Sequence, residues 1–598
     1  MKPPSNTENA GSNVLPRHGA CLVCRKRKLK CDATKPECHE CLATGRTCQY
    51  EDETYRSRTQ QLQDRIKELE ARIKEAESQG SSISSKPRSS SNSSSGGDPS
   101  NGSYTNGGST VAIGSRNGTH SPGNSLSPPV LLSPAHRSAS DLSSNGSNHS
   151  GVAPYEPTSD QTRRLLEAFV LHQVQCAFEL NTDRVIANLR PGATEPVLPV
   201  LLNAMLLMGS HFIEDQSLKH LEPVLLERTK REIDENLEKA IRGKQYNSVH
   251  HLQAMCMVGL YYYIKGRLLE GHHHCTSAIR FAVSLGLNQI SSRTFKPNSP
   301  ARKFKRLFES EQWRPRDPVE LGEAINLWWT CCLLDGGGSA MNGLPPSVSM
   351  NDISTVWPCM LVDFETGLVP NDNYSIAALL DPKLFYDVAN ASKDNVKGCI
   401  SKAIILMTCA GQLDIERVAN PAVSEHWWKR FESCDRATVR FIETLPPVRT
   451  ARNVEDLAYL VFIHTLAYCA TVQLHSALAE FEIVIGAQGD PRGIQPDGTL
   501  GGLSWLRCTE ACRATTLAAR LIADLDMKYM HMFIGLSWVC VAEVLTRDVP
   551  RLRQAGQIEK AREKAGQLDV MEQCMSRLVA TYPVLDLQVR HLQALKNW

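Results

Sequence analysis

The chain has 598 residues, 41% of them hydrophobic and 22% charged, and its 66 basic and 64 acidic residues leave a formal net charge of +2. This length is sufficient for a large core or for several domains, and the near-neutral charge argues against indiscriminate coating of nucleic acid. No stretch reaches 18 uninterrupted apolar residues, and the N-terminal sequence MKPPSNTENAGSNVLPRHG lacks the apolar segment of a signal peptide. We therefore expect no membrane contact and no oxidising compartment, which argues against a disulfide-stapled secreted protein.

Six of the 20 cysteines lie in the stretch CLVCRKRKLKCDATKPECHECLATGRTC, residues 21–48. Their spacing is C-x2-C-x6-C-x6-C-x2-C-x6-C, so one pattern occurs twice. A C-x2-C pair suits one tetrahedral zinc ion, with Zn–S bonds of about 2.3 Å. Two four-coordinate ions need eight sulfur positions, which six sulfurs supply only if two of them bridge both ions. The spacing predicts a cluster of two zinc ions held by six ligands: Cys21, Cys24, Cys31, Cys38, Cys41 and Cys48.

A basic run, RKRKLK, lies between the second and third cysteines. Six thiolates and two zinc ions sum to about −2, so part of this positive charge offsets the cluster and the remainder can meet DNA phosphates. Lys or Arg facing guanine is also the commonest specific base contact. The alternatives are a solvated face or a nuclear-import signal. The candidate DNA-binding residues are Arg25, Lys26, Arg27, Lys28 and Lys30.

The cysteine pattern and the basic run resemble the finger of the fungal zinc binuclear-cluster transcription factors, the group of the yeast galactose regulator. The resemblance covers the whole finger, residues 16–50, and Pro36 matches the family's proline between the two halves. It implies that Cys21 and Cys38 bridge the two zinc ions. It also implies that Lys28, with its neighbour Arg27, reaches the base edges of a CGG-like triplet in double-stranded DNA.

A heptad pattern follows in TQQLQDRIKELEARIKEAE, which begins at Thr59 within the segment 51–79. Isoleucine at the a positions and leucine at the d positions favour two parallel strands, so we expect a homodimer with paired half-sites. The alternative is an amphipathic helix that packs on the chain's own regulatory domain, since fewer than three heptads form a marginal coiled coil. The predicted dimerisation residues are Leu62, Ile66, Leu69 and Ile73.

The composition changes in residues 80–158, where 24 of residues 81–150 are serine. A segment with so few large apolar residues cannot form a core, so we expect disorder here and in residues 1–15. Three Ser-Pro steps, at Ser121, Ser127 and Ser133, lead to the hypothesis of regulation by phosphorylation, against the alternative of an inert spacer.

Residues 159–598 are predicted to form a large all-α domain, so that the chain as a whole is mostly α. One helix face is expected over residues 165–178, and further helices over 200–212, 252–264 and 275–285. The apolar stretches that begin at Leu457 and His531 carry polar residues and are predicted to be buried core helices.

Two segments of this domain resemble the middle homology region of the same family. The first carries an Ala-Arg-Ala pattern that ends in Leu-Gly-Leu at residues 285–287, and the second is EAINLWWTCCLLD followed by GLPPSVSMNDI. Leu344 replaces the family's usual arginine, basic residues are absent before the tryptophans, and a glycine run stands at residues 336–338. The resemblance implies a regulatory domain that works with the transcription machinery or co-regulators.

Other motifs give weaker signals. Residues 272–275, His-His-His-Cys, point in different directions on a helix and are predicted to be structural, and the Gly-rich stretch from Gly486 lacks the Lys-Ser/Thr of a phosphate loop. No catalytic motif is found, and a small-molecule effector site between helices stays open. We expect a nuclear, zinc-dependent regulator of RNA polymerase II genes rather than an enzyme. Its rivals are a zinc-bearing protein-interaction module without base readout, and an enzyme with a DNA-binding appendage.

Overall fold

The computed structural model describes residues 20–27, 29–45, 47–49, 156–242, 246–297, 313–370, 375–420, 422–487, 501–526 and 529–596. The predicted coiled coil, residues 51–79, lies outside the described residues, as do residues 1–15, residues 80–155 and Lys28. The chain divides into two compact units, Met1–Ser121 and Pro122–Trp598.

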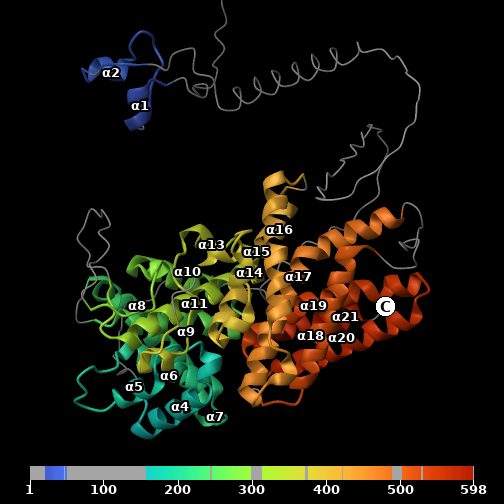
Figure 1. Ribbon diagram of the computed structural model, residues 1–598. Helices are drawn as coiled ribbons and strands as arrows, with labels where there is room; N and C mark the ends of the chain where they lie inside the picture. The colour runs from blue at the N-terminus through green and yellow to red at the C-terminus, as the bar shows by residue number, and fades with distance from the viewer. Residues whose placement is uncertain are drawn as a thin grey trace, which may run out of the picture. The chain divides into compact units, whose positions relative to one another are not determined.

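The N-terminal unit contains the finger, with two short helices, α1 (Leu22–Arg27) and α2 (His39–Ala43) (Figure 1). Each helix begins directly after a cysteine and carries a second cysteine within its first turns, so the repeated sequence pattern folds into a repeated structure. The backbone N–H of Leu22 donates a 2.7 Å hydrogen bond to the carbonyl of Gln49 and joins the two ends of the finger.

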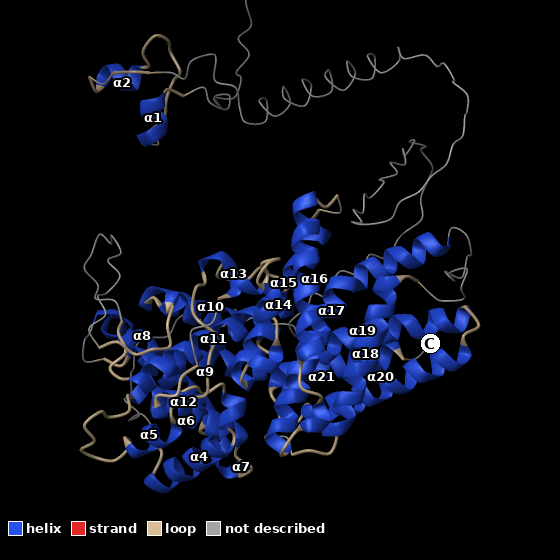
Figure 2. Cartoon of the chain, viewed as in Figure 1, coloured by secondary structure: helices blue, strands red, loops and turns tan. Residues whose placement is uncertain are grey.

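The C-terminal unit is built from helices, and its described residues contain no β-strand, which confirms the all-α prediction (Figure 2). Its N-terminal half contains α4 (Ser159–Leu171), α5 (Thr182–Ala187), α6 (Pro199–Phe212), α7 (Gln216–Lys219), α8 (Glu222–Arg242), α9 (Ser248–Ile264), α10 (Leu268–Leu285), α11 (Pro318–Asn342) and α12 (Leu361–Thr366). Its C-terminal half contains α13 (Ile376–Leu379), α14 (Phe385–Val388), α15 (Val396–Ala419), α16 (Glu425–Thr444), α17 (Val454–Ala487), α18 (Leu503–Ile522), α19 (Met532–Gln554), α20 (Ile558–Leu578) and α21 (Asp586–Leu595). Short 3-10 turns connect several of these helices, among them Gln173–Cys176 after α4.

Local sequence signals start and end these helices. Thr158 and Gln161 form a reciprocal capping box at the start of α4, which satisfies two backbone N–H groups at once. Asp317 caps α11 and Pro318 occupies its first turn, where the missing N–H of proline costs nothing. Gly286, the centre of the Leu-Gly-Leu motif, ends α10 with a φ of 83°, a left-handed conformation that favours glycine.

One helix ends earlier than the sequence predicts. The apolar face expected over residues 165–178 belongs to a helix only as far as Leu171, and a 3-10 turn then occupies Gln173–Cys176. Ala177 closes this turn with a φ of 51°, so the chain turns away and Phe178 packs edge-on against Phe169. The apolar periodicity of the sequence continues past the end of α4 because α4 and the turn after it both pack against the same core.

The helices pack in sequence around a single hydrophobic core that extends from Leu165 to Leu592. In the first half, α4 and α8 pack on α6, α9 packs against α10, and α10 packs against α11. In the second half, α15, α18 and α19 pack on α17, and α20 packs on α18 and α19. The contact of α11 with α15 joins the two halves.

The glycine run of residues 336–338 lies inside α11 and does not interrupt the helix. A β-carbon at Gly336 would stand 2.8 Å from Thr408 Oγ1. One at Gly337 would overlap the ring of Phe533, and one at Gly338 would overlap the hydroxyl of Tyr263. Residues of three other helices or their loops therefore approach α11 where it has no side chains.

Two helices are long and apolar enough to span a membrane by length and composition, Val396–Ala419 and Val454–Ile483. In each, 67% of the apolar window is buried inside the unit, which agrees with the prediction of core helices for the stretch that begins at Leu457.

Candidate metal centre and nucleic-acid interface

The six cysteines of the finger form two groups of four sulfur atoms. One group contains Cys21, Cys24, Cys31 and Cys38, the other contains Cys21, Cys38, Cys41 and Cys48, and within each group the sulfurs lie within 4.8 Å of one another. Cys21 and Cys38 belong to both groups. Six sulfurs thus supply eight coordination positions.

The distances between the sulfurs suit zinc. A ZnS4 tetrahedron with bonds of about 2.3 Å has edges of about 3.8 Å. The Sγ atoms of Cys21 and Cys38 are 3.7 Å apart, as are those of Cys21 and Cys41 and those of Cys24 and Cys38. None of these cysteines is in a disulfide. The donor set and its spacing therefore fit the zinc that this kind of cluster holds.

Backbone N–H groups point at three of the sulfurs. Cys24 N–H donates to Cys21 Sγ, Ala33 N–H to Cys31 Sγ, and Cys38 N–H to Cys48 Sγ, each at 3.4 Å. Such bonds favour the charged form of a thiol, because the donor stabilises negative charge on sulfur. At these sulfurs the backbone donors therefore oppose the effect of desolvation, which disfavours the charged thiolate.

The pKa values show what the cluster needs at neutral pH. Desolvation and hydrogen bonds from neighbouring thiols raise the pKa of Cys41 to about 12, and the same causes raise the pKa of Cys24 even further. Protonated thiols do not bind zinc, and a bound divalent cation reverses this balance by deprotonating them. Ion binding by the finger is therefore coupled to proton release.

The basic run begins on α1 and continues past the end of this helix along the surface of the finger. The side chains of Lys26, Arg27 and Lys30 are exposed, and so is the apolar side chain of Leu29, at 40%. The described residues thus include three of the five predicted DNA-binding residues. The side chain of Arg25 and the whole of Lys28 lie outside the description.

One contact in the finger was not predicted from the sequence. Asp32 Oδ1 accepts a 3.2 Å hydrogen bond from the backbone N–H of His39 at the start of α2, and Asp32 Oδ2 lies 2.7 Å from His39 Nδ1. Hydrogen bonds from Thr34 and then from His39 lower the pKa of Asp32 to about 2. Asp32 follows the third cysteine directly, so it ties one half of the finger to the other beside the metal ligands.

The histidine run of residues 272–274 lies on α10. His273 is exposed, whereas His274 stacks on Tyr262 with ring centroids 4.9 Å apart and Cys275 is buried. Among the described residues, both groups that could hold a metal ion lie in the finger. Packing accounts for His274 and Cys275.

A Ser-His-Asp arrangement, also missed from the sequence, joins α16, α17 and α18. His475 Nδ1 lies 3.1 Å from Ser504 Oγ, and His475 Nε2 lies 3.0 Å from Asp435 Oδ1. Arg507 also donates to Asp435, and the residue exposures of Ser504 and His475 are only 5% and 4%. A buried hydroxyl beside an already paired carboxylate is a structural tie between helices.

Comparisons with known proteins agree with these two units. The family described as fungal Zn(2)-Cys(6) binuclear cluster domain matches residues 19–57. The family described as fungal specific transcription factor domain matches residues 170–406. The chain therefore carries both the zinc-cluster domain and the regulatory domain that the resemblance implied, and the description of the second family is that of a transcription factor. The helices from α16 onward lie beyond the second match.

Individual relatives match short stretches of this chain, 34 to 59 residues long. The chain is 56% identical over 34 residues to the oleate activated transcription factor 3 of Kluyveromyces lactis, which is 6% of this chain and 5% of that protein. It is 45% identical over 38 residues to the transcription factor MAR1 of Candida glabrata, 6% and 3% of the two chains. It is 37% identical over 59 residues to the tropolone cluster transcription factor tropK of Talaromyces stipitatus, 10% and 11% of the two chains. The matches thus span 3% to 11% of these relatives. No solved structure matches the chain.

Proposed function

We propose that this protein is a zinc-dependent, sequence-specific DNA-binding regulator of RNA polymerase II genes that acts in the nucleus. The observation that carries the proposal is the pair of four-sulfur groups that share Cys21 and Cys38, together with the exposed cations Lys26 and Arg27 on α1, which begins directly after Cys21. The two family matches support it. The all-α unit would control output through co-regulators.

Two zinc ions would be held by the six cysteines, with Cys21 and Cys38 as bridging ligands. In this arrangement Cys21 serves both ions, whereas Cys31 serves one. Native mass spectrometry of the full-length chain is expected to show two zinc ions per chain, none in Cys21→Ala and one in Cys31→Ala. Equal zinc content in the two variants would contradict the bridging assignment.

The basic segment would read DNA. We infer that Lys28 and Arg27 contact the base edges of a CGG-like triplet, and that Arg25, Lys26 and Lys30 meet phosphates or the adjoining bases. Arg27→Ala is then expected to lose about 1–3 kcal/mol of discrimination at one base pair. A phosphate contact such as Lys35 would differ, since Lys35→Ala should weaken all sequences alike and reduce the salt slope by about 1.

Two chains would pair through Leu62, Ile66, Leu69 and Ile73, so that the target contains two triplets. The test is selection of random duplex DNA by the full-length chain with zinc, followed by sequencing. Paired triplets at one spacing are expected, and chelation should abolish enrichment. Single triplets would contradict pairing through this segment. A zinc-loaded protein that enriches no sequence would contradict base readout and favour the protein-interaction alternative.

A further inference from the structure

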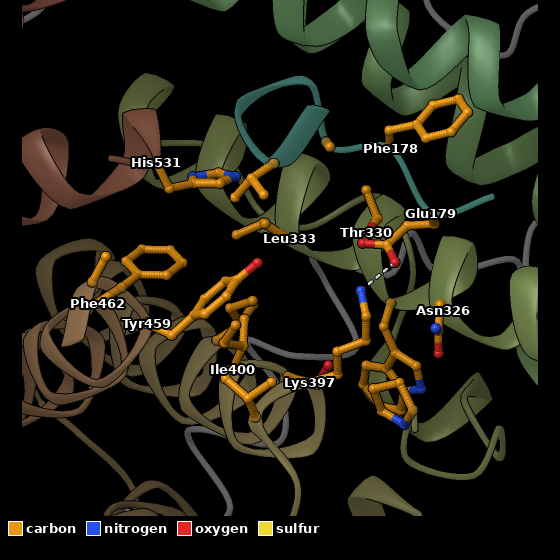
Figure 3. A pocket seen from close by; sticks show the side chains of 18 of the residues that line it. Phe178, Glu179, Asn326, Thr330, Leu333, Lys397, Ile400, Tyr459, Phe462 and His531 are labelled. Atoms are coloured by element: carbon orange, nitrogen blue, oxygen red, sulfur yellow. Dashed lines mark hydrogen bonds and ion pairs between the residues drawn. The ribbon is translucent and has the colours of Figure 1, made fainter. Parts of the chain in front are cut away.

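A cavity of about 290 Å³ lies inside the helical unit (Figure 3). Its wall is formed by α11 and α15, by the turn after α4, by the first turns of α17 and by the start of α19. Ligand pockets of proteins occupy roughly 300–1,000 Å³, so this volume suits a small molecule. The cavity is distant in sequence from the finger and uses none of the residues proposed to bind zinc or DNA.

Most of the wall is apolar and much of it is aromatic. Leu333 and Ile400 face one another across the space, with Phe462 beside His531 (Figure 3). Trp329 also lines the cavity, and its Nε1–H is already used, because it donates a 2.8 Å hydrogen bond to the carbonyl of Val356. A ligand here would therefore bury an apolar body against these side chains.

One end of the cavity contains an ion pair that is internally balanced. Lys397 Nζ donates to Glu179 Oε2 at 2.5 Å, and Thr330 Oγ1 donates to Glu179 Oε1 at 2.9 Å (Figure 3). The charges of Glu179 and Lys397 thus cancel within the wall. A charged ligand would have to separate this pair or enter without a counter-charge, and both cost desolvation energy.

Three polar groups of the wall each have one polar atom without a hydrogen-bond partner among the described residues. Asn326 is 2% exposed, and while its Nδ2 donates to the carbonyl of Cys359 at 3.0 Å, its buried Oδ1 has no hydrogen-bond partner. The hydroxyl of Tyr459 has no hydrogen-bond partner among the described residues and points toward Leu333 (Figure 3). Burial raises the pKa of Tyr459, so the group remains a neutral hydroxyl.

The third group is the imidazole of His531. Its Nδ1 accepts a 3.3 Å hydrogen bond from the backbone N–H of Phe533, and its ring stacks on those of Phe462 and Phe533 with centroids 5.1 and 5.5 Å away. Burial lowers the pKa of His531 to about 4, so the ring is neutral at pH 7. A neutral imidazole whose Nδ1 accepts carries its proton on Nε2, which is therefore a free donor.

We propose that this cavity binds a small uncharged molecule with an aromatic or alicyclic body and a hydroxyl or carbonyl group directed at Tyr459 and His531. The apolar wall takes the body, and the two neutral donors take the oxygen. The balanced Glu179–Lys397 pair offers a charged ligand no counter-charge inside the cavity, and the remaining carboxylate of the wall, Glu455, is exposed to solvent. The site goes beyond DNA binding and does not depend on the function proposed for the finger.

The position of the site makes it a link between parts of the chain. Asn326 and Lys397 lie within residues 170–406, which match the fungal domain, whereas Tyr459 and His531 lie beyond that match. A ligand that contacts both groups stabilises the assembled unit by an amount that grows with the logarithm of its concentration. Occupancy is therefore measurable as thermal stabilisation of the full-length chain.

The test uses three probes with one ring system: 2-naphthol, anionic 2-naphthoate and cationic 2-naphthylmethylamine. Isothermal titration calorimetry of the full-length, zinc-loaded chain is expected to show saturable binding of 2-naphthol and at least tenfold weaker binding of either charged probe. No saturable binding of 2-naphthol up to about 1 mM, or equal binding of a charged probe, would overturn the proposal.

Two tyrosine variants provide a matched control. Tyr459→Phe removes the hydroxyl that faces the cavity, and loss of one hydrogen bond is expected to weaken 2-naphthol binding by roughly 3- to 10-fold. Tyr468→Phe makes the same change on the same helix, outside the cavity wall, and should leave binding unchanged. Ala458→Leu, which fills the cavity, should abolish binding and leave circular dichroism unchanged. Equal affinity in the two tyrosine variants would place the probe elsewhere and refute the assignment.

Discussion

Tyr263 lies between two glycines, Gly271 of α10 and Gly338 of α11. Substituting Gly338 therefore tests quantitatively how closely Tyr263 packs against α11. On one side the ring lies against Gly271 of α10, where a β-carbon would overlap it. On the other side a β-carbon at Gly338 would overlap the tyrosine hydroxyl and stand 2.8 Å from His272 Nδ1. The hydroxyl donates to the carbonyl of Leu334 at 3.3 Å. The ring is fully buried and therefore cannot move away from an added methyl group.

Gly338→Ala brings two opposing effects. Alanine is better than glycine in a helix interior by roughly 0.5–1 kcal/mol. Overpacking costs about 1–3 kcal/mol, and loss of the Tyr263 hydrogen bond costs roughly 0.5–1.5 kcal/mol more. The unfavourable effects dominate, so we expect the free energy of unfolding to fall by roughly 0.5–4 kcal/mol.

Gly566→Ala is the matched control. Gly566 lies inside α20, and nothing stands within 4 Å of a β-carbon built on it. This variant should gain the helix preference alone, roughly 0.5–1 kcal/mol. Urea unfolding followed by circular dichroism of the two full-length variants measures the difference. In a Tyr263→Phe background the added methyl at position 338 should cost less, because the clashing oxygen is gone. Equal stability of the two alanine variants would refute the close approach of Tyr263 to α11.

Three further variants test other contacts. Asp32→Ala should remove the cap on α2 and destabilise the zinc-loaded finger by about 0.5–2 kcal/mol, while Asp32→Asn keeps the acceptor; zinc competition against a chelator separates the two. Burial raises the pKa of Glu323 from 4.5 to about 7, so the wild type loses stability as the pH rises from 4.5 through 7. Glu323→Gln should therefore be more stable than wild type at pH 8, by on the order of 1–3 kcal/mol, and show no such advantage at pH 4, measured by urea unfolding. Lys564 Nζ lies 2.5 Å from Asp548 Oδ2 in the core. Lys564→Met alone leaves a buried carboxylate without its partner and should lower the free energy of unfolding by about 3–5 kcal/mol. The double variant with Asp548→Leu should recover much of this loss, as a double-mutant cycle of urea unfolding would measure.

The finger could be predicted in detail because its information is local. All six cysteines lie within residues 21–48, and tetrahedral zinc chemistry limits how a doubled C-x2-C pattern can close. The sharing of Cys21 and Cys38 between two sulfur groups agrees with that expectation. The Asp32–His39 contact could not be predicted, because it forms only if the chain reverses direction between the two halves of the finger. The spacing of the cysteines does not indicate this reversal.

The helices were predictable from their periodicity, but some of their ends and contacts were not. Residues 165–178 keep the apolar periodicity of a helix, yet the helix ends at Leu171 and Ala177 adopts a left-handed conformation. A glycine usually marks such a position, and here the sequence has alanine. In the sequence alone, the glycine run of α11 is only a departure from the family pattern. In the fold it is a place where Tyr263 and Phe533 approach a helix, and only the partners give it that meaning.

The cavity shows why the more specific features of such a domain escape sequence analysis. Glu179 and Lys397 are 218 residues apart, and neither is unusual among its neighbours in the chain. Their pairing matters because the two charges cancel inside the cavity beside the free donors of Tyr459 and His531, while the remaining carboxylate of the wall, Glu455, is exposed to solvent. Each of these residues alone is an ordinary polar residue on an amphipathic helix or loop. They form a candidate binding site only because the fold brings four separate segments of the chain to one cavity. Selectivity for an uncharged ligand is therefore a property of the packing of α11, α15, α17 and α19, and substitutions that loosen this packing should broaden it to charged probes.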